Sequence, residues 1–383
     1  MTCRKGWSRF LCWLTVCMIP FAAFAEPSLT EKSLTLGESS ISYPIVVGLE
    51  DEAAAKTVND AIVAEGRVAD YLTRMSELIS SGRIVTTWIG GLYGDLLSVG
   101  FLTEGMVTDS RNSSVWTAAN LNLTDGQPFQ WTDLFTNPET AGEELAAYLE
   151  ESVSQDLSPM LLNNDLTPIP DVFRVDDTGL TLLYPAAQCC TLRDRAGDIH
   201  LAWCELRPML NLEKGSLADR LGVSETLMLT ENSAERIRSA AGSGCLPGIP
   251  AAVGDGLQAL TDEYLLLTDP DVYEGGRMFA LEGGCFRRVY LLTDHLSEDW
   301  DNSVVQGIRM DRGNFSGLCI GTTAREEWRL ILGEPDYTVT YDDEKAELNR
   351  TVPGECDYYS CGKYQLRLQS DLDGILYSII LTE

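Results

Sequence analysis

The chain has 383 residues, of which 58 are acidic and 28 basic, so its formal net charge is −30. Hydrophobic residues make up 44% and charged residues 22% of the chain, a composition that excludes a disordered, collagen-like or coiled-coil protein. The length predicts two domains, each large enough to bury its own core. So large a negative charge repels phosphates, which excludes nucleic acid as an expected partner and favours basic partners.

The first 25 residues have the pattern of a signal peptide. Three basic residues precede an apolar run from Phe10 to Phe24, and Ala25 ends the segment with a small side chain. The run is about 15 residues long, short of the roughly 20 that a membrane-spanning helix needs. We therefore expect a secreted or cell-envelope protein, cleaved after Ala25, with no stable membrane span. Lipidation at Cys17 and an uncleaved anchor are the alternatives.

Cleavage would leave eight of the 11 cysteines, an even number that suggests disulfides in an exported chain. These candidates are Cys189, Cys190, Cys204, Cys245, Cys285, Cys319, Cys356 and Cys361. Cys356 and Cys361 flank a short polar stretch before the strand-like run 364–368, so a hairpin there would bring them within bridging distance. The alternative for this pair is two free thiols, and the sequence does not choose among the other pairings.

The first half of the chain reads as one α+β unit over residues 26–215. A strand over 41–47 is followed by a helical region over 51–80, whose apolar residues recur at helical spacing. Residues 83–129 have the β-branched and aromatic runs of an antiparallel meander. A second helix is expected after an Asn137 cap with Pro138 in its first turn. The remaining strands of this half are expected over 172–175, 180–184 and 199–205.

After a linker over 211–223, a second α+β domain is expected over residues 216–383. Strand-like runs over 276–281, 287–292 and 304–310 come first. A helix with a capping box at Thr323 and a stop at Gly333 follows, and then strands over 337–341, 364–368 and 375–381. The expected fold class is therefore α+β, with two domains that each pack an antiparallel sheet against one or two helices.

The first domain contains motifs of a known family. Ser42-Tyr43-Pro44 is followed by a helix with Val58-Asn59 and, after the meander, by the run 125–135, Asp-Gly-Gln-Pro-Phe-Gln-Trp-Thr-Asp-Leu-Phe. Asp177-Thr178-Gly179-Leu180 and Leu183-Tyr184-Pro185 complete the pattern. Over residues 35–210 the chain resembles the extracytoplasmic domain of RsiV-type anti-sigma factors and PdaC-type deacetylases, a domain of unknown function. The motif residues to which we give a structural role are Asp125, Gly126, Asp133, Leu134 and Phe135.

This resemblance implies an exported recognition domain without catalytic activity. Its sensor members bind a lysozyme, whereas its deacetylase members carry a separate catalytic domain. The present chain lacks both the sigma-binding segment ahead of the apolar run and a His-x-x-x-His metal motif, and Ser113-Ser114 stand where the family has Gly-Ala-His. The final 60 or so residues are more loosely similar to SmpA/BamE-type and β-lactamase-inhibitor-type modules, which are also binding folds.

The sequence offers few residues that could form a catalytic or metal-binding site. His200 and His295 are its two histidines, too few for a histidine-based triad or metal site, and we assign no metal and no cofactor. A zinc site from His200, Cys204 and the Cys189-Cys190 pair is the weaker alternative to disulfides. Ser360-Cys361-Gly362-Lys363 matches Ser-x-x-Lys without its companion motifs, and Asp371-Leu372-Asp373-Gly374 is better explained as a turn than as a calcium loop.

We therefore predict an exported, non-enzymatic binding protein whose partner is a basic extracellular protein, such as lysozyme, or a cell-wall component. The alternative is a carboxylate-dependent cell-wall hydrolase, for which 58 acidic residues offer many pairs and no specific one. Specific binding needs a desolvated aromatic centre, and Trp116, Trp131 and Trp203 are the candidates, although tryptophans are more often part of a core.

Overall fold

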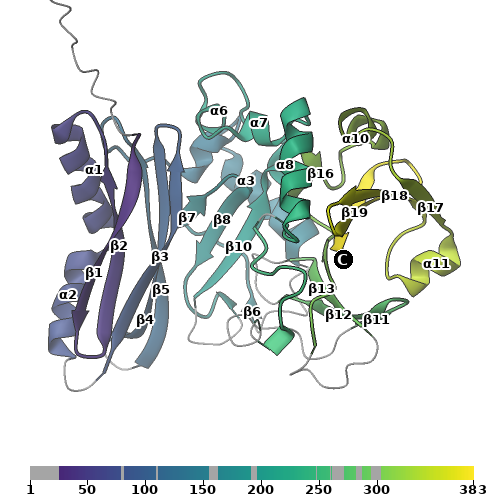
Figure 1. Cartoon of the computed structure of the whole chain (residues 1–383). Coiled ribbons are helices and arrows are strands. Elements are labelled where there is room, and N and C mark those ends of the chain that lie inside the picture. Colours follow the sequence, from purple (N-terminus) through teal and green to yellow (C-terminus); the bar gives the residue numbers. More distant parts are fainter. Residues whose placement is uncertain are drawn as a thin grey trace, which may run out of the picture.

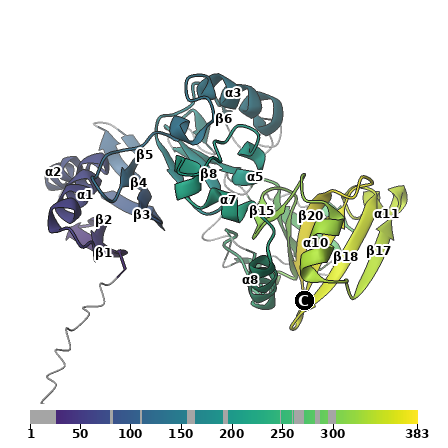
Figure 2. The ribbon, with the colours of Figure 1, turned by 90° about the horizontal axis from the view of Figure 1, so that it is seen from above.

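The computed structural model describes residues 26–78, 82–108, 111–154, 163–190, 196–246, 248–258, 260, 271–281, 287–294 and 303–383. It is an α+β structure built on antiparallel sheets with helices packed on them, which confirms the predicted fold class. Figures 1 and 2 show a five-stranded sheet with two helices at one end, a smaller sheet in the middle, and an eight-stranded sheet at the other end. The predicted signal peptide, Cys285 and His295 lie outside the described residues.

The five-stranded sheet has the order β1-β2-β3-β4-β5. Its strands and helices are β1 (Ser28–Leu36), β2 (Ser39–Val47), α1 (Glu52–Glu65), α2 (Val68–Glu77), β3 (Ile84–Tyr93), β4 (Leu96–Thr108) and β5 (Arg111–Asn122). All neighbours are antiparallel except β2 and β3, because the two helices carry the chain across one face between them. The Asn59 side chain ties α1 to this sheet by bonding both the N–H and the carbonyl of Val46.

The middle of the molecule is a three-stranded sheet with short helices around it. Its elements are η1 (Trp131–Leu134), α3 (Ala141–Tyr148), η2 (Leu149–Val153), β6 (Asn163–Asn164), β7 (Phe173–Val175), β8 (Gly179–Tyr184), β9 (Cys189–Cys190), β10 (Gly197–Ala202), α5 (Trp203–Leu206), α6 (Leu217–Arg220) and α7 (Val223–Thr226). The sheet order is β10-β8-β7. Buried polar bonds, Ser98 to Asn120 and Asn120 to the carbonyl of Phe173, join it to the back of the first sheet.

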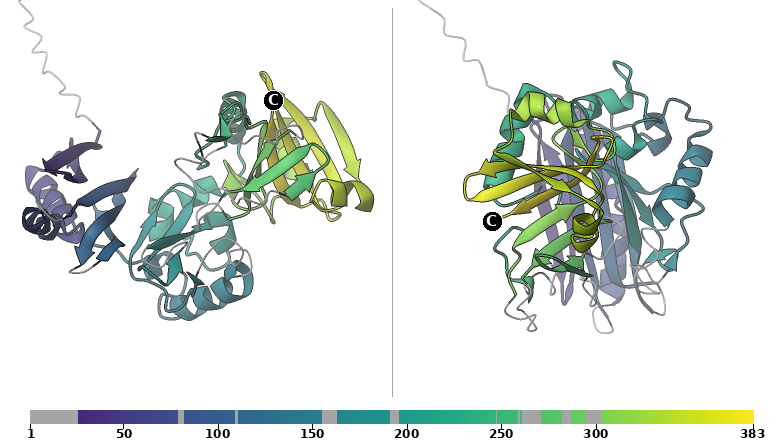
Figure 3. Two further views of the ribbon diagram at one scale, coloured as in Figure 1. Left: turned by 90° about the horizontal axis from the view of Figure 1, so that it is seen from below. Right: turned by 90° about the vertical axis from the view of Figure 1, so that its right-hand side faces the viewer.

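The last part is an eight-stranded sheet with two helices on one face, shown from its outer side in Figure 3. Its elements are α8 (Glu231–Gly242), β11 (Asp271–Tyr273), β12 (Gly276–Ala280), β13 (Val289–Thr293), β14 (Gly307–Met310), β15 (Asn314–Phe315), β16 (Leu318–Cys319), α10 (Arg325–Leu332), β17 (Tyr337–Tyr341), α11 (Asp343–Leu348), β18 (Gly354–Cys361), β19 (Tyr364–Ser370) and β20 (Leu376–Thr382). The order is β11-β12-β13-β14-β20-β19-β18-β17, so the early strands extend the later sheet.

Helix α10 is fixed to this sheet by one fully buried carboxylate. Asp357 on β18 is 0 % exposed and accepts bonds from Arg325 and Arg329 at 2.7 Å each, and from the indole N–H of Trp328 at 3.2 Å. Burial alone would raise the pKa of Asp357, but the hydrogen bonds from the two guanidinium groups outweigh it and hold that pKa well below its usual range. The Asp357 carboxylate therefore stays ionised while α10 is packed on the sheet.

Several predicted boundaries differ from the structure. The helical region over 51–80 is interrupted at Gly66 and Arg67, where Arg67 adopts a left-handed conformation with φ of 52°. The helix expected from Asn137 begins at Ala141, because residues 138–140 form a turn first. The strand expected over 199–205 ends at Ala202, and the chain turns into α5 at Trp203.

The most consequential correction concerns Cys356 and Cys361, for which a hairpin pairing was predicted. Both lie on β18, which runs unbroken between them, and both are buried free thiols. Five residues of extended strand separate two Cα atoms by about 16 Å and place the side chains on opposite faces, whereas a disulfide needs Cα atoms within about 7 Å. The predicted Cys356–Cys361 bond is therefore wrong.

Hydrophobic packing divides the chain near residue 230. One cluster gathers buried residues from Leu96 and from 129–227, with Cys319, and another gathers residues 237–381. The short helices α6 and α7 pack in the first of these clusters through Leu217 and Val223. The predicted division into residues 26–215 and 216–383 stays a prediction.

A buried ion cluster joins these two regions. Glu205, at the end of the middle sheet, accepts hydrogen bonds from Arg287 at 2.6 Å and from Arg312 at 2.6 and 2.9 Å. The Tyr148 hydroxyl and the Ala202 N–H also bond its carboxylate. Burial by itself would raise the pKa of Glu205, but Arg312 and Arg287 outweigh it and lower that pKa to about 2.

We predict that Glu205→Gln destabilises the protein by about 3–5 kcal/mol, because it removes the carboxylate that pairs with the buried guanidinium of Arg312. The contribution of Glu205 to stability is fully present above its unfolded pKa of 4.5 and is lost as the pH falls towards 2. The free energy of unfolding of Glu205→Gln should therefore fall less between pH 7 and pH 3 than that of the unaltered protein. Urea unfolding at pH 7 and pH 3 measures both effects. Glu213→Gln, at an exposed position, is the control; an equal loss in both variants would contradict the prediction.

Candidate functional site

The eight-stranded sheet carries a cavity of about 620 Å³ on the face opposite α8 and α10. This volume lies in the range of small-molecule sites, about 300–1,000 Å³. Its lining is polar and aromatic, with cationic, acidic, amide, hydroxyl and a few apolar side chains: Tyr273, Glu274, Leu292, Gln306, Arg309, Tyr341, Lys345, Asn349, Thr351, Tyr358, Arg367, Gln369, Ile380, Thr382 and Glu383.

Strand alternation accounts for the two faces of this sheet. On β19, Leu366 and Leu368 enter the hydrophobic cluster under the helices, whereas Arg367 between them faces the cavity. On β14 the same alternation buries Ile308 on the helix side and turns Arg309 towards the cavity. One face of the sheet is therefore a core surface, and the other is the wall of a pocket.

Helix α11 closes the cavity by linking the two edge strands of the sheet. It follows β17, and its end contacts β11: the Glu274 N–H donates to the Leu348 carbonyl, Asn349 Nδ2 donates to Glu274 Oε2, and Arg350 Nε donates to the Val272 carbonyl. In Figure 1, β17, α11, β11 and β12 accordingly follow one another around a ring. The sheet is thus curved into a barrel-like wall that α11 completes.

Arg309 is a structural cation at the base of this pocket. Its guanidinium makes a two-pronged ion pair with Asp311, at 2.7 Å for each bond, and donates to the carbonyls of Asn349 and Arg350 behind α11. Because its donors are used in this way, Arg309 holds the turn after α11 in place and is neutralised by Asp311.

Arg367 and Lys345 differ from Arg309, because neither forms an ion pair with any residue that the structure describes. Arg367 lies 5.2 Å from the centre of the Tyr358 ring, donates one bond to Thr382 Oγ1 at 3.0 Å, and has a buried Nε with no acceptor. The Lys345 ammonium lies 4.7 Å from the centre of the Tyr341 ring. Two cations are thus held over aromatic rings, with donors left for a ligand.

The tyrosines of the pocket supply further donors. Burial raises the pKa of the Tyr273, Tyr341 and Tyr358 phenols, so all three stay protonated at neutral pH. Tyr358 also stacks on Tyr337, with ring centres 4.3 Å apart, and this contact fixes the plane of the ring under Arg367. The arrangement suits a ligand that combines an anionic group with a flat or apolar surface.

The tryptophans proposed as binding residues lie elsewhere. Trp203 is 0 % exposed and donates its indole N–H to the Asp176 carbonyl, and Trp131 is 7 % exposed and packs edge-on against Phe135. Trp116 is half-buried on β5. The structure places Trp131 and Trp203 in the core of the middle region, so neither offers a surface to a partner, and it does not bring the three together.

The family-motif residues have local structural roles. Asp125 accepts a bond from the Gln127 N–H, and Gly126 adopts a φ of 69° at the turn, a conformation that favours glycine. Asp133 accepts from the Gln130 N–H and so begins η1, while Leu134 and Phe135 are buried. These residues form a turn and the start of a short helix.

Among the described residues, no group of three or more His, Cys, Asp or Glu side chains is placed to hold a metal ion. The nitrogens of His200 lie 3.3 and 3.1 Å from the hydroxyls of Thr178 and Thr181. Burial lowers the pKa of His200 to about 4, so it is neutral at pH 7. The cysteines Cys204, Cys245, Cys319, Cys356 and Cys361 are free thiols, whereas the Cys190 side chain lies outside the described residues. No described helix has both the length and the apolar composition that crossing a bilayer requires.

The pocket residues were not predicted from the sequence. The signal available was the arginine in each of two otherwise apolar strand runs, Ile308-Arg309-Met310 and Leu366-Arg367-Leu368. Such an arginine must face away from the core side of its strand. That both arginines face one cavity follows from strand order, since β14 and β19 flank β20.

We predict that Arg309→Met lowers the free energy of unfolding by about 3–5 kcal/mol, because it leaves the buried Asp311 carboxylate unpaired. Arg367→Met should change it by no more than about 1 kcal/mol, because Arg367 has no carboxylate partner among the described residues. Urea unfolding followed by circular dichroism compares the two variants. Equal losses would show that Arg367 is also a structural cation.

Comparisons with known proteins give no family for this chain: no family model and no curated protein matches it. Among solved structures, a DUF3298 family member from Bacteroides fragilis (BF2082) is similar at 15% identity, with 49% of this chain and 93% of that chain covered and a TM-score of 0.34. A DUF3298 family protein from Pseudomonas aeruginosa (PA4972) is 8% identical, with 48% of this chain and 94% of that chain covered and a TM-score of 0.32. A DUF4309 family protein from Bacillus subtilis (YjgB) is 12% identical, with 40% of this chain and 97% of that chain covered and a TM-score of 0.26. The structures similar to this chain thus include members of two families of domains of unknown function, and none is named as an RsiV-, PdaC- or SmpA/BamE-type protein.

Proposed function

We propose that this chain is an exported binding protein without catalytic activity, and that the pocket of its eight-stranded sheet takes a cell-wall fragment in which a carboxylate lies beside a sugar ring. The observation that carries the proposal is the pair Arg367 and Lys345, two cations held over tyrosine rings in one cavity with no ion-pair partner among the described residues. The RsiV/PdaC-like and SmpA/BamE-like resemblances agree with a binding role.

Charge supports an anionic ligand for this pocket. The chain as a whole has about twice as many acidic as basic residues, yet the cavity wall contains three basic residues, Arg309, Lys345 and Arg367, and two acidic ones, Glu274 and Glu383. An isolated cation in a partly enclosed site attracts an anion more strongly than it would in bulk water. The local reversal of charge therefore favours a carboxylate over a basic ligand.

The remaining lining supports a sugar-like group beside that carboxylate. Gln306, Gln369 and Asn349 supply amides, and Thr351 and Thr382 supply hydroxyls, which can both donate and accept. Tyrosine rings give flat, amphipathic contact surfaces at little cost in conformational entropy. An exported protein would meet cell-wall fragments. The support for export is the pattern of residues 1–25, in which basic residues precede an apolar run.

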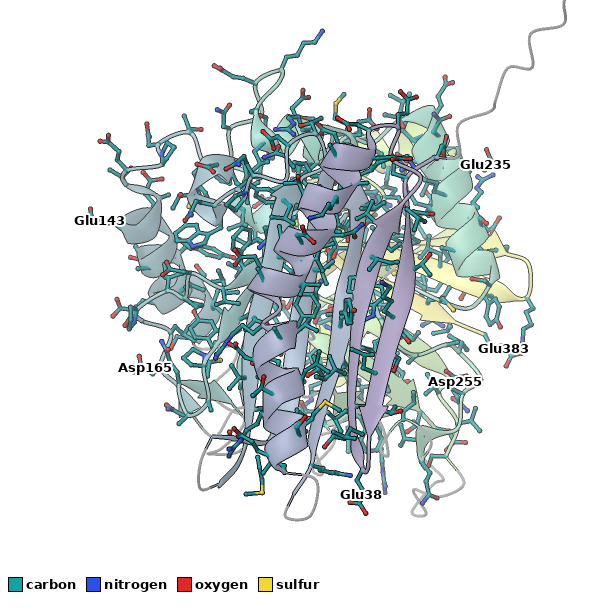
Figure 4. The ribbon with its side chains drawn as sticks, turned by 90° about the vertical axis from the view of Figure 1, so that its left-hand side faces the viewer. Glu38, Glu143, Asp165, Glu235, Asp255 and Glu383 are labelled. Atoms are coloured by element: carbon teal, nitrogen blue, oxygen red, sulfur yellow. The ribbon has the colours of Figure 1, made fainter. Side chains whose placement is uncertain are left out.

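A second candidate partner is a basic extracellular protein such as a lysozyme, and the observation that favours it is the net charge of −30. Figure 4 shows carboxylates on several sides of the molecule, among them Glu38, Glu143, Asp165 and Asp255, pointing outwards. Such a field increases the association rate of a basic protein and is weakened by salt. This electrostatic attraction would act over the surface of the molecule and does not require the pocket.

The hydrolase alternative finds less support. Glycoside cleavage needs a carboxylic acid whose pKa is raised so that it holds a proton. Among the described residues, each carboxyl group with a shifted pKa, namely Asp176, Glu205, Asp336 and Asp357, has it lowered by hydrogen bonds or neighbouring cations. The hydrolase therefore stays the alternative and the binding protein the proposal.

We expect muramyl dipeptide, which joins a wall sugar to a carboxylate-bearing peptide, to bind the full chain saturably in calorimetry. Arg367→Met should weaken this binding about 10- to 100-fold, because hydrogen bonds to charged groups contribute about 1.5–3 kcal/mol. Arg67→Met is a matched control, since Arg67 also lies over a tyrosine, Tyr71, but immediately before α2, which packs on the first sheet. The Arg67→Met variant should bind muramyl dipeptide with the affinity of the unaltered chain. No saturable heat, or equal weakening of binding in both variants, would refute the pocket as the site.

We also expect the full chain to bind hen lysozyme, with an affinity that falls but does not vanish as the salt concentration rises. The screening length shrinks from about 10 Å at 0.1 M to about 3 Å at 1 M, which removes long-range attraction but leaves close contacts. Calorimetry at both salt concentrations measures this. Complete loss at high salt would leave only non-specific attraction between opposite charges.

A further inference from the structure

A second cavity, of about 300 Å³, lies at the outer edge of β5. β5 is the last strand of the five-stranded sheet, and no described strand pairs with its outer edge at Thr117 and Ala118. Both of these residues line the cavity although consecutive strand residues point to opposite faces, so the cavity straddles the edge of the sheet. Its volume lies at the lower end of the range of small-molecule sites, about 300–1,000 Å³.

Two carboxylates from distant parts of the chain line this cavity. Glu65 is the last residue of α1, and Asp171 lies two residues before β7. Both side chains are exposed, and neither carboxylate has an ion-pair or hydrogen-bond partner in the structure. The fold therefore places two unpaired negative charges around one small cavity.

No basic side chain among the described residues of the lining neutralises these charges. The basic residues nearest in the sequence pair elsewhere: Arg67 with Asp70, and Arg174 with Asp176. The last turn of α1 also has no basic residue, so the negative end of its backbone dipole lies at Glu65 without a side-chain cation. The cavity is therefore favourable for a positively charged ligand.

The rest of the wall suits an organic cation. Phe129 and Phe173 are 7% and 4% exposed and pack edge to face, with ring centres 5.9 Å apart. Aromatic rings attract ammonium groups and cover the methylene groups that carry them. The Ala118 carbonyl points outwards from the sheet edge, because the Asn120 carbonyl two residues on accepts a bond there from the Phe129 N–H. Thr117 Oγ1 is buried and has no hydrogen-bond partner, so the wall has oxygen acceptors to spare.

From these contacts we propose that the cavity at the edge of β5 binds a primary ammonium group on an aliphatic stem, the chemistry of a lysine side chain or a free alkylamine. The carboxylates of Glu65 and Asp171 balance its charge, and the two phenylalanine rings cover its stem. The pocket of the eight-stranded sheet is different, because three basic residues line it. The inference does not depend on that pocket or its ligand.

The probe that tests this site is Nα-acetyl-lysine N-methylamide, titrated against the full chain at low salt and followed by ligand-observed NMR. It should bind saturably, whereas the same probe acetylated at Nε should not bind, because acetylation removes the charge. Butylamine distinguishes the two sources of the ammonium group: equal affinity supports a site for alkylamines in general, and weaker affinity supports a site for lysine side chains. No saturable binding of the charged probe, or equal binding of its acetylated form, would overturn the proposal.

Variants locate the binding of the lysine probe. Glu65→Gln and Asp171→Asn should each weaken it about 2- to 5-fold, the effect of one exposed ion pair. Glu143→Gln on α3 is a matched control, because it removes one charge from an exposed carboxylate outside the cavity. All three side chains are exposed, so these variants should fold. Equal weakening in Glu143→Gln would show attraction by the overall charge alone and would overturn the site.

Muramyl dipeptide separates this proposal from that of the pocket. It has no ammonium group, so its binding should be the same in Glu65→Gln and in the unaltered chain, and it should not compete with the lysine probe. Competition between the two ligands would contradict the assignment of separate sites. Failure of the lysine probe to bind leaves the pocket proposal standing, and failure of muramyl dipeptide to bind leaves this one standing.

Discussion

Burying positive charge in the interior demands a buried partner, and Glu205 meets this demand for two arginines at once. Arg287 and Arg312 come from one side of the boundary between the large hydrophobic clusters, and the carboxylate comes from the other. Because the Glu205 carboxylate pairs with both of these buried guanidinium groups, it ties the two regions together. Arg312 also follows directly after Asp311, which pairs with Arg309 at the base of the pocket. The segment 309–312 therefore connects the boundary between the regions to the wall of the candidate site.

Much of the fold could be predicted because strand alternation and helix caps are local signals. The meander over 83–129, the helix ending at Gly333 and the strand runs of the second half all have such signals, and the structure contains them. The strand β18 was missed because Asp357, Tyr358 and Ser360 resemble a polar turn. Asp357 is tolerated within that strand because Arg325 and Arg329 neutralise it, and this contact with α10 cannot be read from neighbouring residues.

The candidate site was less predictable, because it depends on which strands are neighbours. Tyr341, Lys345 and Arg367 are spread over β17, α11 and β19, and none of them belongs to a sequence motif. Tryptophans are plausible anchors by residue type alone, yet Trp203 fills a core position under the turn at Asp176. The short sequence spacing of Cys356 and Cys361 likewise suggested a pairing that an extended strand forbids.

A crystal structure of the full chain with muramyl dipeptide tests the pocket most directly. We expect the carboxylate of the ligand within hydrogen-bonding distance of Arg367 or Lys345, and its sugar ring against one of the tyrosines of the cavity wall. The Arg309–Asp311 pair should keep its geometry, since that pair supports the wall and has no donors to spare. A ligand bound on another surface, or a pocket left empty at a saturating concentration of muramyl dipeptide, would contradict the assignment of this cavity as the binding site.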